Sequence, residues 1–305
     1  MKHVIRLIHL QPCPKGNDYE MSIRCSLSLA NLEDDSCTYE ALSYEWGPPT
    51  DTFLYIWLDG CKFAVRPNLW SALYYLKRAG HRGDSRDNGE TAGYGDDGEN
   101  QQARILWIDA LCIDQENEEE RNHQVRQMGM IYQHATRVVA WLGPTIQDRP
   151  IPVPICLGLE FIEHLGTTRQ KRYDDVFADW RVGFGDSQIG GPPIRKDDYR
   201  WEFMHQVLHM TYWTRLWVIQ ELVLAKDIVL KFGKHSVSFR ALEHVLGQSR
   251  RWDLTVKWVG VKTSWETRAF LNNSPAVLTA GNTTAFKVAQ QHSKENHSII
   301  NQTRS

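Results

Sequence analysis

The stretch 104–142 constrains the fold of this chain more than any other part of it. It opens with an apolar run, Arg104–Ile108, of the kind found in strands buried on both faces. A loop over 109–116 follows, and then a helix that starts near Asn117 and repeats apolar side chains every three or four residues. A second apolar run, Val138–Leu142, ends at a Gly-Pro pair. Strand, helix and strand at this spacing predict a right-handed βαβ crossover in a parallel sheet.

The N-terminal part predicts further strands. Residues 1–30 contain two alternating runs, and Tyr39–Tyr44 is a third strand candidate. Alternation continues on both sides of Asp59-Gly60, a dipeptide typical of hairpin turns because both residues tolerate positive φ. A helix begins after Arg66. We therefore expect an α/β fold with a mostly parallel central sheet flanked by helices, elaborated at its N-terminus by strands and a hairpin.

Composition predicts where this fold is interrupted. Residues 80–102 are rich in Gly, Asp, Asn and Arg and carry few apolar side chains, which is typical of a disordered insertion. Residues 144–198 read as an irregular insertion with one helical patch near 155–165. We expect one domain over residues 1–250 and a C-terminal extension, 251–305, that is largely disordered after about residue 270.

Charge and cysteine content exclude several classes of protein. The chain has 35 basic and 37 acidic residues, and the absence of a basic stripe argues against nucleic-acid binding. It has no apolar run long enough to span a bilayer, and its first ten residues do not resemble a signal peptide. The six cysteines form no CxxC pair or metal-ligand pattern, so we expect no metal and a reducing, cytoplasmic location.

Candidate binding residues follow two of the predicted strands. Tyr44, Trp46 and Gly47 lie where the Tyr39 strand ends, and Asp109 follows the strand at 104–108. Because open α/β folds bind ligands at the carboxyl ends of their strands, these residues could line a pocket. The aromatic residues could equally close the core, and Asp109 could serve a local turn. For Asp114, turn formation or helix capping is the favoured interpretation.

Glu221 is the candidate for chemistry. In a helix from Thr214 to about residue 225, it would share a face with Trp217. A carboxylate beside an indole and partly out of water can act as an acid, a base or a stabiliser of positive charge. The alternative is an ion pair with Arg215 or Lys226 at the surface.

Three ordered blocks of sequence resemble the heterokaryon-incompatibility (HET) domain of filamentous fungi. The first is Tyr39–Gly47, and the second runs from Leu106–Gln115 through the helix to Val139–Gly143. The third comprises Arg215–Trp217, Gln220, Glu221 and Ala225. The resemblance covers roughly residues 1–245, with departures at Leu111 and Asp114, where isoleucine and asparagine are usual.

The resemblance implies an effector of vegetative incompatibility that triggers programmed cell death. HET domains are similar to TIR domains, which implies a TIR-like, flavodoxin-like sheet, and some TIR domains cleave NAD⁺. The TIR helix with the catalytic glutamate is similar to Trp217–Leu222, although Val218 replaces its usual cysteine. The resemblance therefore implies catalysis by Glu221, with NAD⁺ as a substrate rather than a bound cofactor. Its substrate-binding residues would be Tyr44, Trp46, Gly47, Asp109 and Trp217.

The resemblance also implies protein partners. We expect self-association and an upstream incompatibility or NLR-type protein. The alternative to an enzyme is a non-enzymatic interaction module that signals by self-association. In that case Glu221 would be a buried structural partner of a residue such as Arg215.

Overall fold

The computed structural model describes residues 3–12, 22–34, 36–48, 50–78, 103–144, 155–167, 199–215 and 217–249. The chain divides into two compact units, which are treated separately below. The first comprises residues 1–147 and 224–236, and the second comprises 148–223 and 237–305. The predicted insertion at 80–102, most of that at 144–198 and the extension at 251–305 lie outside the described residues.

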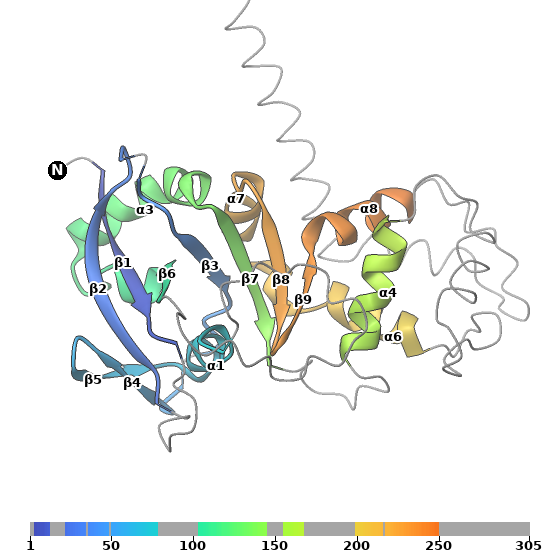
Figure 1. Cartoon of the computed structure of the whole chain (residues 1–305), viewed down its shortest axis with the longest axis horizontal. Coiled ribbons are helices and arrows are strands. Elements are labelled where there is room, and N and C mark those ends of the chain that lie inside the picture. The colour runs from blue at the N-terminus through green and yellow to red at the C-terminus, as the bar shows by residue number, and fades with distance from the viewer. Residues whose placement is uncertain are drawn as a thin grey trace, which may run out of the picture. The chain divides into compact units, whose positions relative to one another are not determined.

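Nine strands of the described residues form one sheet, in the order β5-β4-β2-β1-β6-β3-β7-β8-β9 (Figure 1). Their bounds are β1 Val4–Leu10, β2 Arg24–Asn31, β3 Glu40–Tyr44, β4 Leu54–Leu58, β5 Cys61–Val65, β6 Arg104–Trp107, β7 Arg137–Gly143, β8 Ile228–Phe232 and β9 His235–Ser238. The strands β6, β3, β7 and β8 run parallel to one another. The strands β1 and β2 are antiparallel, as are β4 and β5. The expected α/β fold is thus confirmed, but the sheet, which was expected to be mostly parallel, is only partly parallel.

Helices cover both faces of the parallel strands. The first unit contains α1 (Pro67–Leu76), α2 (Asp109–Cys112) and α3 (Glu118–His134). On one face, Trp107 of β6 packs edge-on against Tyr132 of α3. On the other, Trp141 of β7 donates its indole N–H to Asn68 of α1 over 2.9 Å. Ala41 of β3 pairs with both Trp107 and Val138, so these two residues point to the same face of the sheet. Successive residues of a strand alternate between the faces, so Trp141, three residues after Val138, lies on the face opposite to Trp107.

The predicted strand–helix–strand unit is confirmed, with one addition. β6 and β7 are parallel, but β3 lies between them, so the connection through α3 passes over a strand. The Asn117 side chain accepts a hydrogen bond from the Glu120 N–H and caps α3, as expected. The segment 109–116 was expected to be a loop, but its first residues form α2 because the N–H groups of Leu111 and Cys112 bond back to the Ile108 carbonyl.

The second unit is helical. It contains α4 (Ile155–Thr167), α6 (Tyr199–Leu208), a 3₁₀ turn η2 (Thr211–Thr214), α7 (Val218–Val223) and α8 (Phe239–Ser249). Two glycines of α4 permit close packing: a Cβ on Gly158 would lie 2.4 Å from the Phe203 ring, and one on Gly166 would lie 2.4 Å from the Ala241 Cα. The Ser238 hydroxyl oxygen accepts from the Arg240 N–H and caps α8.

The expectation of a helix that begins at Thr214 is wrong. The Thr214 hydroxyl donates backward to the Thr211 carbonyl over 2.7 Å and closes η2. The helix that follows, α7, begins only at Val218 and has six residues. Trp217 therefore precedes the helix that carries Glu221, instead of lying within its first turns.

Candidate functional site

Trp46 and Asp109 meet at the carboxyl ends of two neighbouring parallel strands. β3 ends at Tyr44 and β6 at Trp107, so both residues emerge at the same edge of the sheet. The Trp46 indole N–H donates to Asp109 Oδ2 over 2.9 Å. The other carboxylate oxygen, Oδ1, accepts from the Ala110 N–H over 2.7 Å. Asp109 therefore serves the local turn that begins α2 and also binds an aromatic residue of the next strand.

Residues at the start of α1 hold this edge in place. The Arg66 guanidinium lies 5.5 Å from the Trp46 ring centroid and donates to the Gly47 carbonyl over 3.0 Å. Asn68 donates to the Glu45 carbonyl over 2.6 Å. Gly47 has a φ of +75°, a conformation that favours glycine. Arg66 and Asn68 were not predicted from the sequence as site residues, because both resemble ordinary residues at the start of a helix.

Tyr44 and Asp114 have more local roles. The Tyr44 side chain is 2% exposed, so it belongs to the core beside the candidate edge. Asp114 is exposed and accepts from the Glu116 N–H over 3.1 Å, which confirms the favoured interpretation as a turn residue.

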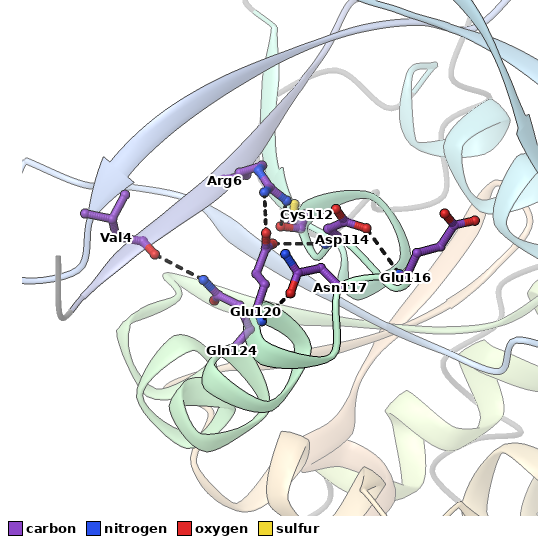
Figure 2. A network of polar contacts seen from close by, with 8 residues as sticks. All are labelled: Val4, Arg6, Cys112, Asp114, Glu116, Asn117, Glu120 and Gln124. Carbon is purple, nitrogen blue, oxygen red and sulfur yellow. Dashed lines mark hydrogen bonds and ion pairs between the residues drawn. The ribbon is translucent and has the colours of Figure 1, made fainter.

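A polar network fixes the segment between α2 and α3 (Figure 2). Arg6 of β1 donates to the Cys112 carbonyl and forms a 2.7 Å ion pair with Glu120 of α3. The second oxygen of Glu120 accepts from the Asp114 N–H over 3.0 Å. Burial disfavours the charged form of Glu120, but its bonds to Arg6 and to the Asp114 N–H outweigh this and hold its pKa below the ordinary value. The network anchors the chain just after the candidate residue Asp109.

Glu221 forms a two-point ion pair inside the second unit. Its two carboxylate oxygens accept from the Arg215 guanidinium over 3.0 and 3.2 Å. The residue is 1% exposed, and the Arg215 guanidinium also lies 5.5 Å from the Tyr212 ring centroid. This arrangement is the structural partnership weighed from the sequence. Lys226, the other candidate partner, donates instead to the His134 carbonyl in the first unit.

Trp217 differs from Glu221 in its surroundings. Trp217 is 45% exposed, whereas Glu221 is buried. The two residues are nevertheless joined through the backbone, because the Glu221 N–H donates to the Trp217 carbonyl over 3.0 Å. The structure thus brings together Trp46, Gly47 and Asp109 in the first unit, and Arg215, Trp217 and Glu221 in the second.

Two of the described cysteines, Cys25 and Cys112, are buried. No group of three His, Cys, Asp or Glu side chains in the part of the chain that the structure describes could hold a metal ion. Burial raises the pKa of the Cys25 and Cys112 thiols to about 12, so both stay protonated near neutral pH. None of the described helices is long and apolar enough to cross a bilayer.

The chain is similar in sequence to proteins of heterokaryon incompatibility. Residues 96–221 match the sequence model of the family described as heterokaryon incompatibility protein (HET). The chain is 28% identical over 250 residues to heterokaryon incompatibility protein 6, OR allele, of Neurospora crassa. That match covers 77% of this chain, which spans about a third of the relative's length. No solved structure matches the chain. The resemblance expected from the sequence is therefore confirmed, and residues 96–221 are the part that matches the heterokaryon incompatibility family.

Proposed function

We propose that this chain acts in fungal heterokaryon incompatibility, as the effector that starts programmed cell death. The proposal rests on the family match over residues 96–221 and on the similarity to the Neurospora protein. The matched region includes Asp109, the Arg6-binding residue Glu120 and Glu221.

We further propose a TIR-like, flavodoxin-like core. Numbered by chain order, the parallel strands β3, β6, β7 and β8 lie in the order 2-1-3-4. This is the order with which a flavodoxin-like sheet begins, and its ligands bind at the carboxyl ends of strands 1 and 3. In this chain that place is the edge formed by the ends of β3 and β7, next to Trp46.

The mechanism that the geometry supports best is signalling by assembly. The observation that carries this choice is the ion pair between Glu221 and Arg215. A carboxylate whose two oxygens both bind one guanidinium is neutralised, and it offers little charge to a substrate. Glu221 then holds η2 and α7 together, and the domain presents a surface to its partners instead of turning over a ligand.

NAD⁺ cleavage is the second candidate, favoured by the Trp46–Asp109 pair at the carboxyl ends of β3 and β6. In this reaction the ribose–nicotinamide bond breaks, and nicotinamide leaves with the bonding electrons. Water then adds to the ribose cation and releases a proton. Glu221 would stabilise that cation once Arg215 moves away.

A charge swap separates the two mechanisms. The double variant Glu221→Arg/Arg215→Glu keeps a buried ion pair but moves the carboxylate to another backbone position. We expect cells that express the swapped protein to die as they do with wild type, whereas Glu221→Arg alone should be inactive through unfolding. Survival of cells that contain folded, assembled swapped protein would instead identify Glu221 as catalytic.

A further inference from the structure

The hairpin of β4 and β5 collects most of the exposed apolar side chains of the described residues. Of seven large hydrophobic side chains exposed there, five lie on this hairpin or next to it: Phe53, Leu54, Tyr55, Trp57 and Phe63. β5 is the last strand of the sheet, and four of its five residues are exposed. An edge strand that exposes its unpaired backbone groups is a template for pairing with another strand.

The hairpin register identifies the backbone groups that face the open edge. Asp59 and Gly60 form a two-residue turn with φ values of +50° and +79°, so Leu58 and Cys61 form the first hydrogen-bonded pair. Pairs alternate along an antiparallel ladder, and Lys62 and Ala64 are therefore not bonded to β4. Trp57, the β4 residue opposite Lys62, shows the same alternation: its N–H points away from β5 and donates to the Ile23 carbonyl over 2.8 Å.

We propose that a second copy of this chain pairs with β5 through these groups. In this arrangement the two β5 strands are antiparallel and Phe63 of one copy lies opposite Phe63 of the other. Lys62 of each copy then lies opposite Ala64 of the other. Each of these two pairs exchanges two backbone hydrogen bonds, which makes four in total. A register centred on Lys62 sets two ammonium groups against each other, and one centred on Ala64 sets Lys62 against Arg66. Only the register centred on Phe63 combines all four bonds with no pair of like charges.

Side chains near the edge are compatible with this pairing. The Lys62 ammonium lies 4.0 Å from the Tyr55 ring centroid of its own hairpin, so its charge is held over β4. Phe63 meets its counterpart in a non-hydrogen-bonded pair, where side chains approach most closely. This inference deepens the assembly mechanism proposed above, but dimer formation is measured without reference to cell death or NAD⁺.

Cysteine cross-linking tests the register. In a Cys61→Ser background, Phe63→Cys should form a reducible dimer under mild oxidation, because the two new thiols face each other. Lys62→Cys and Ala64→Cys are matched controls on the same exposed strand, and each should cross-link far less because its counterpart lies two residues away. Equal cross-linking at all three positions, or none at position 63, would overturn the proposal.

A proline variant tests the hydrogen bonds. Ala64→Pro removes an N–H that faces the open edge and should leave the β4 ladder and the melting temperature nearly unchanged. Loss of two intermolecular hydrogen bonds should weaken self-association about 30-fold in sedimentation experiments. Wild-type protein that stays monomeric, or an Ala64→Pro variant that is folded and self-associates normally, would refute the pairing. If this variant does not fold, the cross-linking result decides.

Discussion

The Glu221 carboxylate lies in surroundings that suit a structural ion more than a catalytic one. Its side chain is 2% exposed and that of Arg215 is 19% exposed, so water screens neither charge well. A buried pair of this kind adds little net stability, but removing one partner leaves the other charge without compensation. Loss of either partner should therefore destabilise the second unit.

Removing the Glu221 charge should destabilise the protein strongly. We expect Glu221→Gln to lower the free energy of unfolding by about 3 kcal/mol, since Arg215 then remains charged and partly buried. Urea denaturation measures the change. Arg240→Gln, at an exposed position of α8 in the same unit, is the control and should shift it by less than about 0.5 kcal/mol. Equal effects of the two changes would contradict a structural ion pair.

The Trp46–Asp109 hydrogen bond should also contribute to stability. Trp46→Phe keeps an aromatic ring beside Arg66 but removes the donor to Asp109 Oδ2. Because hydrogen bonds to charged groups are worth about 1.5–3 kcal/mol, we expect a loss of about 1.5 kcal/mol on thermal denaturation. Trp70→Phe removes a more exposed indole donor, to the Tyr55 carbonyl, and should cost less. A larger loss of stability for Trp70→Phe than for Trp46→Phe would show that the Trp46–Asp109 hydrogen bond is weak.

Acid should weaken the contact between Arg6 and Glu120. The folded protein lowers the pKa of Glu120 from its ordinary value of 4.5, so the contact stabilises the fold above that pH. This stability is lost as the pH falls through the lower, folded pKa. The difference in free energy of unfolding between wild type and Glu120→Gln should therefore shrink as the pH drops below 4.5. A difference that is constant across this range would show that the ion pair is not responsible.

At the scale of elements, local signals predicted most of what the structure contains. Asp59-Gly60 specified a hairpin and Asn117 a helix start because each acts within a few residues. The Arg6–Glu120 pair joins residues 114 positions apart, and no local pattern marks such a pair. Thr214 satisfied the rule for a helix cap, but the same hydroxyl can bond backward, and here it closes η2.

The sequence predicted one part of the candidate site, the edge with Trp46 and Asp109, but not the burial of Glu221. The ends of β3 and β6 were recognised as one sheet edge, and Trp46 and Asp109 do meet there. The burial of Glu221 was harder to foresee, because it depends on the short α7 and on the position of Arg215 just after η2. Spacing on an ideal helix placed Trp217 and Glu221 on one face, whereas the real helix starts after Trp217.

Helix packing in the second unit should respond differently at two glycines. Gly158→Ala and Gly166→Ala should both destabilise the protein, by roughly 1–3 kcal/mol, because each new methyl group is too close to a neighbour. Phe203→Leu should rescue Gly158→Ala in part, since the obstacle there is a side chain. Ala241→Gly should rescue Gly166→Ala much less, because the Ala241 backbone remains 2.4 Å from the new Cβ. Equal rescue in thermal melts would contradict this packing.

At the scale of the whole molecule, two features bear on function. Trp46 and Asp109 meet where the parallel strands β3 and β6 end, and β5 is the exposed edge strand at which we propose that a second copy pairs. We favour assembly as the mechanism, because Arg215 binds both oxygens of the Glu221 carboxylate, which NAD⁺ cleavage would need. The two mechanisms differ in whether a product is released.

Nicotinamide release from NAD⁺ by purified, concentrated protein is the most direct test of this account. Wild type should be compared with the swapped variant Glu221→Arg/Arg215→Glu, with both shown to be folded and self-associated. We predict no release from either protein, because Glu221 is bound to Arg215 and serves the fold. Release by wild type that is lost in the swapped variant would contradict the account and establish Glu221 as a catalytic residue.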